Sequence, residues 1–190
     1  MILPIRAFGD PVLRKVGKDI DKDYPGLQEL IDNMFETMYS ANGIGLAAPQ
    51  IGLDLRLFVI DVTPLADDED YEDIKDELAD FKKVFINATI LEESGEEWKF
   101  NEGCLSIPDV REDVKRKETI VIEYYDENFM KHTETFSDIR ARVIQHEYDH
   151  IEGVLFTDHL SVLKKKLVKG KLTKISQGEV SISYKMRFPK

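Results

Sequence analysis

The sequence has little of several features that would place a protein outside the ordinary globular class. Cys104 is the only cysteine among 190 residues, so no disulfide can form within the chain. No apolar run approaches the roughly 18 residues of a transmembrane helix, and the start of the chain is too weakly apolar for a secretory signal. No internal repeat or low-complexity tract divides the sequence. We therefore expect a single compact domain covering residues 1–190, in a reducing, cytoplasmic setting.

Charge is not lacking, but it is unevenly distributed around the net value of −11. Residues 67–80 hold nine acidic residues and one lysine, a net charge of −8, whereas residues 164–190 hold nine basic residues and one acidic residue, a net charge of +8. We expect the acidic segment to be a solvated loop or a short exposed helix. The basic segment is either a solvated end or a surface for RNA, with ribosome contact as the partner hypothesis. Neither DNA nor a membrane is expected as a partner.

Hydrophobic periodicity predicts an α+β fold, with strands in mixed or antiparallel sheets wrapped around a central helix. The predicted helices cover residues 11–17, 25–40, 138–152 and 158–168. Pro25 is expected in the first turn of the second helix. Leu160, Leu163 and Leu167 are expected to face the core from the last helix. The predicted strands cover residues 55–61, 84–92, 97–100, 119–125, 130–136 and 180–186. In the third helix, Ser137 is the predicted N-cap and Gly153 the predicted stop.

The third predicted helix contains the most informative motif. Residues 145–150 read Gln-His-Glu-Tyr-Asp-His, which includes His-Glu-x-x-His. Because positions i and i+4 share one face of an α-helix, His146 and His150 can direct two imidazoles at one metal ion. Glu147 lies beside them, where it can act as a base toward water. Two ligands, a base and an open coordination position indicate a hydrolase.

A catalytic metal site of this kind needs a third protein ligand. Cys104 is the strongest candidate, because Gly103 allows close approach of the backbone and a thiolate accepts ferrous iron, zinc and other divalent ions. A small buried apolar side chain is the alternative role for a lone cysteine. Glu152 or His159, downstream of the motif, would instead complete the site of a general zinc peptidase. The non-enzymatic alternative is a structural metal site or an RNA-interaction module.

Three separated motifs of the chain resemble those of the peptide deformylases. They are Gly-Ile-Gly-Leu-Ala-Ala-Pro-Gln at residues 43–50, Glu-Gly-Cys-Leu-Ser at residues 102–106, and the motif at residues 145–150. Their order and the length of the chain also match that family. The resemblance implies a metal-dependent hydrolase that removes the formyl group from N-formylmethionine at the start of nascent peptides. It also implies Fe²⁺ as the usual cellular metal, often replaced by Zn²⁺, Ni²⁺ or Co²⁺ in preparations.

The resemblance also implies roles for individual residues. The implied metal ligands are Cys104, His146 and His150. Glu147 would take a proton from the attacking water and deliver it to the departing amine. The Gln50 side-chain amide and the Leu105 N–H fall where the family's oxyanion contacts lie, and such donors stabilise the charge of a tetrahedral intermediate.

The substrate pocket is predicted from weaker signals. The expected contact residues are Ile44, Gly45, Gly103, Arg111, Ile139 and Val143. The glycines would let a peptide backbone approach closely, as an added strand would; turn formation is their alternative role. The apolar side chains suit a methionine, although each is equally suited to the core. Arg111 is expected to pair with Glu102 or to contact the substrate, and an ordinary surface ion pair is the alternative.

Overall fold

The structure is a computed structural model and describes residues 1–189. The strands are β1 (Ile5–Arg6), β2 (Gly45–Ala47), β3 (Leu57–Asp61), β4 (Lys82–Cys104), β5 (Ile107–Tyr125), β6 (Lys131–Ser137) and β7 (Met186–Arg187). The α-helices are α1 (Leu27–Ser40), α2 (Lys75–Ala79), α3 (Asp138–Ile151) and α4 (Val162–Ser176). Short 3-10 helices cover Pro11–Arg14, Ala48–Ile51, Thr63–Asp67, Glu69–Ile74 and Phe156–His159.

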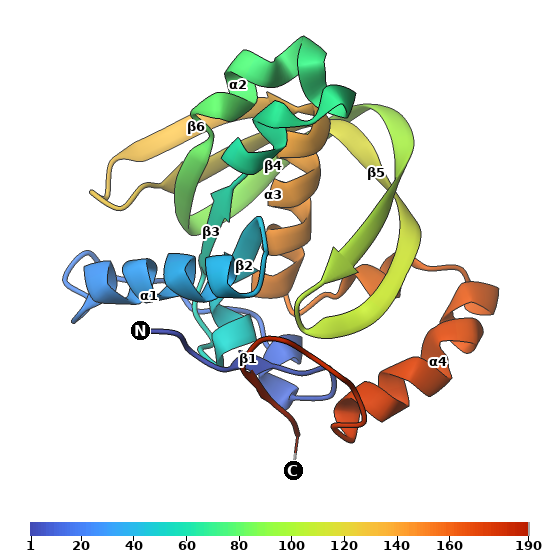
Figure 1. The fold of residues 1–190 in the computed structure, drawn as a ribbon. Coiled ribbons are helices and arrows are strands. Elements are labelled where there is room, and N and C mark those ends of the chain that lie inside the picture. Colours follow the sequence, from blue (N-terminus) through green and yellow to red (C-terminus); the bar gives the residue numbers. More distant parts are fainter. Residues whose placement is uncertain (190) are drawn as a thin grey trace.

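Helix α3 stands at the centre of the molecule, with strands around it (Figure 1). Five strands form one antiparallel sheet in the order β2-β3-β4-β5-β6, whereas β1 and β7 form a separate parallel pair. The predicted α+β class, with strands wrapped around a central helix, is therefore confirmed. The β1–β7 pair also brings the two ends of the chain together.

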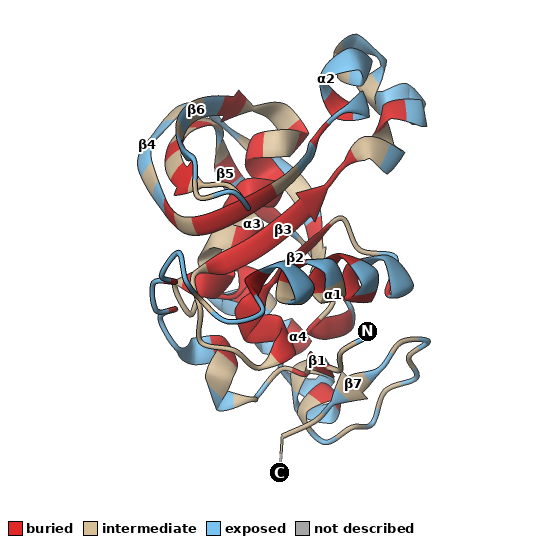
Figure 2. Cartoon of the chain, turned by 90° about the vertical axis from the view of Figure 1, so that its left-hand side faces the viewer, coloured by how far each residue is buried: buried red, intermediate tan, exposed pale blue. Residues whose placement is uncertain are grey.

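The short apolar strand β3 contributes side chains to two hydrophobic clusters, one on each face of the sheet. Phe58 and Ile60 pack in a cluster that includes residues of α3, whereas Leu57 and Val59 pack in a cluster that includes residues of α1. All four side chains are fully buried, and the whole strand is coloured as buried in Figure 2. A strand covered on both faces is continuously apolar rather than alternating. This double packing anchors the sheet against the motif helix.

Strands β4 and β5 form a hairpin much longer than the separate strands predicted from the sequence. They pair from Ile86 and Tyr125 to Cys104 and Ile107, with four register shifts along the way. Such irregularities bend and twist a ribbon. The outer part of the hairpin is rich in exposed charged side chains, so an apolar pattern does not reveal it. The hairpin ends in a tight turn that places Cys104 at its tip.

One predicted helix start is wrong, whereas another is correct in position but lacks the expected side-chain cap. Helix α1 begins after Gly26, so Pro25 precedes the helix and does not lie in its first turn. Helix α3 follows Ser137, but that side chain makes no capping bond. Instead, the Asp138 carboxylate accepts the N–H of Arg140 at 3.0 Å, which satisfies a free donor of the first turn.

The C-terminal region differs most from the prediction. Helix α4 begins at Val162, and Leu163 and Leu167 are 68% and 70% exposed rather than inward-facing. The packed face instead contains Val168 and Ile175. Of the expected last strand, residues 180–186, only Met186 lies in a strand, which is β7 (Met186–Arg187). The prediction chose the wrong buried face of this helix, because α4 has apolar residues on more than one face.

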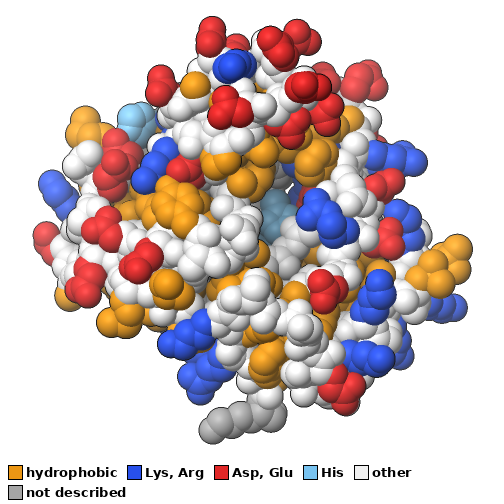
Figure 3. Space-filling view, viewed as in Figure 1, with side chains coloured by type: hydrophobic (Ala, Val, Ile, Leu, Met, Phe, Trp, Pro, Cys, Tyr) orange, Lys and Arg blue, Asp and Glu red, His pale blue; other side chains and the backbone are white. Residues whose placement is uncertain are grey.

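The acidic segment is exposed, as expected. It covers the end of one 3-10 helix, a second one and α2, and most of its side chains are accessible. Acidic side chains gather over this region at the top of the molecule (Figure 3). Lys190, the last residue of the basic segment, lies outside the described residues. None of the helices in residues 1–189 has the length and apolar character needed to cross a membrane.

Candidate active site

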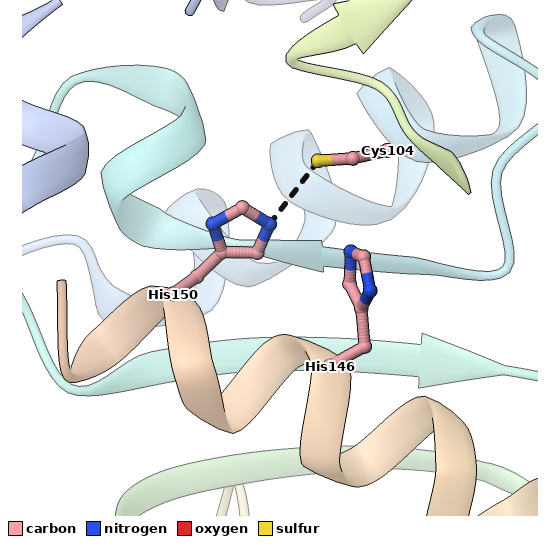
Figure 4. Close-up of side chains that lie close together, drawn as sticks. All are labelled: Cys104, His146 and His150. Atoms are coloured by element: carbon pink, nitrogen blue, oxygen red, sulfur yellow. Dashed lines mark hydrogen bonds between the residues drawn. The ribbon is translucent and has the colours of Figure 1, made fainter. Parts of the chain in front are cut away.

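Three potential metal ligands meet between the hairpin tip and the central helix. Cys104 comes from the end of β4, and His146 and His150 come from α3 (Figure 4). The Cys104 Sγ lies 3.3 Å from the His150 Nε2, and one ligand atom from each residue lies within 4.8 Å of the others. No other group of three Cys, His, Asp or Glu side chains in residues 1–189 meets this criterion. The helical spacing predicted from the motif thus brings both imidazoles to the cysteine.

The donor set suits a divalent transition metal. Burial alone would raise the pKa of the Cys104 thiol, but His150 and His146 lower it to about 5, so the sulfur is a thiolate at neutral pH. The His146 Nδ1 lies 3.0 Å from the Glu102 carboxylate, which leaves its second ring nitrogen for a ligand bond. One thiolate and two imidazoles match a three-ligand catalytic site with an open position.

The downstream side chains have other partners. Glu152 pairs with Arg56 at 2.7 Å, and the His159 Nε2 lies 2.8 Å from the Asp149 carboxylate. Neither residue belongs to the Cys104 group. The geometry therefore does not support the general zinc-peptidase arrangement, in which one of them would be the third ligand.

A buried ion-pair network supports His146. Glu102 accepts hydrogen bonds from Arg116 at 2.8 and 3.1 Å and from Arg142 at 2.9 Å. Burial alone would raise the pKa of Glu102, but its bonds with His146 and Arg116 hold that pKa well below its usual range. The Arg142 guanidinium also lies over the Trp98 ring, 4.4 Å from its centroid. A carboxylate held in this way fixes the orientation of a ligating imidazole.

The predicted pair between Arg111 and Glu102 is wrong. Arg111 instead donates to the side-chain and backbone oxygens of Asn101, at 3.0 and 2.6 Å. Along a strand, successive side chains point to opposite faces, and Glu102 faces the core whereas Asn101 is exposed. The sequence alone did not identify Arg116 and Arg142 as partners. The one signal in the sequence was Arg142, which lies one helical turn before His146 on the apolar face of α3, where a buried arginine needs an acidic partner.

Glu147 is buried at the edge of the site. Burial raises the pKa of its carboxyl to about 7, and its Oε2 has no hydrogen-bond partner in residues 1–189. Gly45 lies directly against it, since a Cβ at that position would be 2.4 Å from the Glu147 Oε1. A side chain at residue 45 would displace the carboxylate. The predicted base thus has a free oxygen and a position that depends on a glycine.

Gln50 is held with its amide nitrogen toward the thiolate. Its Oε1 accepts the Ala47 N–H at 2.8 Å, and its Nε2 donates to the Ser106 hydroxyl at 3.3 Å and to the Cys104 Sγ at 3.5 Å. The side chain is 2% exposed. Leu105 follows Cys104 in the hairpin turn. Both predicted oxyanion donors therefore lie beside the candidate metal group.

A cavity of about 550 Å³ opens at this group, and Figure 3 shows a hollow with a histidine side chain visible inside it. The predicted site residues that line it are Ile44, Gly45, Gln50, Gly103, Cys104, Leu105, Arg111, Val143, His146 and Glu147. Ile139 does not line it, because this residue of the first turn of α3 packs in the core and is 1% exposed. Residues 181–184 line the cavity and were not predicted.

Comparison with known proteins agrees with this geometry. A family model described as Polypeptide deformylase matches residues 2–166. A peptide deformylase of Christiangramia forsetii is 66% identical over 190 residues, which are 100% of this chain and 97% of that protein. One of Flavobacterium johnsoniae is 62% identical and covers 99% of this chain and 96% of its own length. The crystal structure of a peptide deformylase from Legionella pneumophila has a TM-score of 0.79 and 37% identity, covering 94% of this chain and 98% of that one.

Proposed function

Because the chain belongs to the peptide deformylase family, we propose that the Cys104 group and Glu147 form its catalytic centre. The enzyme is a hydrolase that removes the N-formyl group from nascent polypeptides and releases formate. The observation that carries the residue assignment is the meeting of a thiolate and two imidazoles at a cavity that also holds a buried, free carboxylate oxygen. We propose that residues 1–190 act as one catalytic domain.

The proposed metal ligands are Cys104, His146 and His150. A bound divalent ion supplies Lewis-acid polarisation of the formyl group and lowers the pKa of water toward neutrality. Fe²⁺ is the proposed cellular ion, and the same donors accept Zn²⁺, Ni²⁺ or Co²⁺. Glu102 positions His146 through the Nδ1 contact at 3.0 Å.

The chain's own side chains would move the protons and stabilise the charge. Glu147 accepts a proton from water as the oxygen bonds to the formyl carbon. The Gln50 Nε2 and the Leu105 N–H donate to the oxyanion that forms. When the carbon–nitrogen bond breaks, Glu147 delivers its proton to the amine, so that formate and a free amino terminus leave. In this proposal, Ile44 and Val143 line the space for the methionine side chain, and Gly45 and Gly103 leave room for the peptide backbone.

The direct test is formate release from formyl-Met-Ala by anaerobically purified protein, with metal analysis of the same sample. We expect one formate for each new amino terminus and about one iron per chain. Acetyl-Met-Ala is the matched control, because its extra methyl group should be excluded by a site built for formyl. A sample holding one metal ion per chain that releases no formate would contradict the proposed function.

We also propose that the enzyme works in the cytoplasm, where it meets its nascent substrates, and that α4 contacts the ribosome. The support is a helix surface that combines exposed lysines with three exposed apolar residues, which are Val162, Leu163 and Leu167. RNA phosphates attract such a surface in a salt-dependent manner.

Replacing Lys165, Lys166 and Lys169 by glutamate should weaken co-sedimentation with ribosomes at low salt by at least about tenfold. The matched control changes three exposed lysines elsewhere, which are Lys22, Lys99 and Lys115, and so alters the net charge equally. Equal binding by the two triple variants would show that α4 is not the contact surface. Formate release should remain normal in both.

A further inference from the structure

The end of the chain returns to the active-site cavity. After α4, the backbone turns back, and β7 pairs in parallel with β1 through Ile5 and Met186. The stretch before β7 lines the cavity with residues 181–184. Ile182 and Tyr184 are half-buried there, and they alternate with exposed serines. This return segment follows the region matched by the family model, which ends at residue 166.

The turn that carries Cys104 is held from both ends of the chain. Leu105 and Ser106 are the two residues between β4 and β5. The Tyr184 hydroxyl donates to the Leu105 carbonyl at 2.8 Å, and the Phe8 N–H donates to the Ser106 carbonyl at 2.8 Å. Both carbonyls of the turn are therefore bound by segments distant in sequence. Those segments are joined to each other by the β1–β7 pair.

Leu105 is also restrained on its other side. A Cβ on Gly43 would lie 2.8 Å from the Leu105 Cδ1, so the leucine side chain packs closely against that glycine. Leu105 thus lies between Gly43 and Tyr184, next to a candidate metal ligand. An oxyanion donor is effective only when its N–H is oriented before the reaction begins.

We propose that Tyr184 is a positioning residue for deformylation, because its hydroxyl fixes the Leu105 backbone and thereby the orientation of the Leu105 N–H. The inference rests on the proposed role of Leu105 as an oxyanion donor. Tyr184 touches neither the candidate metal ligands nor Glu147 through a hydrogen bond in residues 1–189. Its effect should therefore appear in turnover rather than in metal binding or substrate affinity.

The test is Tyr184→Phe in the full-length, metal-loaded enzyme, which removes the hydroxyl and keeps the ring. We expect kcat for formyl-Met-Ala to fall roughly three- to tenfold, as for the loss of one hydrogen bond, with KM changed by less than twofold and the metal content unchanged. The matched control is Tyr124→Phe. That tyrosine hydroxyl donates to Glu134 and does not line the cavity, so kcat should stay within twofold of the wild type.

Thermal unfolding of both variants separates positioning from simple loss of stability. A kcat within twofold of the wild type for Tyr184→Phe would overturn the proposal, and so would a rise in KM without a fall in kcat. An equal fall in kcat for Tyr124→Phe would overturn it as well, because a general loss of stability would then explain both. Failure of the proposed function is distinct, since wild-type enzyme would then release no formate.

Discussion

Glu147→Gln is expected to lower kcat for formate release by roughly 10²–10⁴-fold, the range for loss of a general acid–base group. Glutamine has the same shape as glutamate, but it cannot accept the proton of the attacking water or return it to the amine. The Glu147 carboxylate is not one of the three candidate metal ligands, Cys104, His146 and His150. Metal content should therefore stay near one ion per chain.

The measurement is steady-state formate release combined with metal analysis of each preparation. Glu152→Gln is the matched control, because it makes the same change on the residue that follows α3, where the carboxylate pairs with Arg56. The control should retain activity within about threefold, as expected for a partly exposed ion pair. If metal-loaded Glu147→Gln turned over within tenfold of the wild type, Glu147 would not be the base.

Cys104→Ala should weaken metal binding by more than about 100-fold, since loss of a residue that only hydrogen-bonds to a ligand already costs about 10–100-fold. Two imidazoles then remain, and the thiolate charge that balances the ion is gone. Formate release should fall below detection once weakly bound metal is removed. Competition with a chelator of known affinity measures the loss directly.

His159→Ala is the control for the third ligand, because His159 is the downstream histidine that a zinc peptidase would use. The His159→Ala variant should keep its metal, since the wild-type His159 Nε2 lies against Asp149 rather than the Cys104 group. Circular dichroism of each protein checks that α3 and the sheet are intact. Retention of metal and activity by Cys104→Ala, with loss of both in His159→Ala, would reverse the assignment of the third ligand.

Much of the fold class followed from local patterns. The predictions of a helix at α1 and of a buried strand at β3 were correct, because a helical period and a short apolar run are both local signals. The long hairpin was not found whole, because its outer half is solvated and its pairing depends on a partner strand. Helix α4 was assigned the wrong inward face, since its apolar residues occupy more than one side.

For the candidate site, the sequence by itself determined the residue types and their local spacing. His146, Glu147 and His150 share one helical region because α-helix geometry alone relates their positions. Only the tertiary structure decided the rest: the bent hairpin brings Cys104 to α3, Glu102 pairs with two arginines rather than Arg111, and Tyr184 reaches the turn beside the cysteine. These contacts join segments far apart in the chain, so they depend on strand register and packing rather than on any local period.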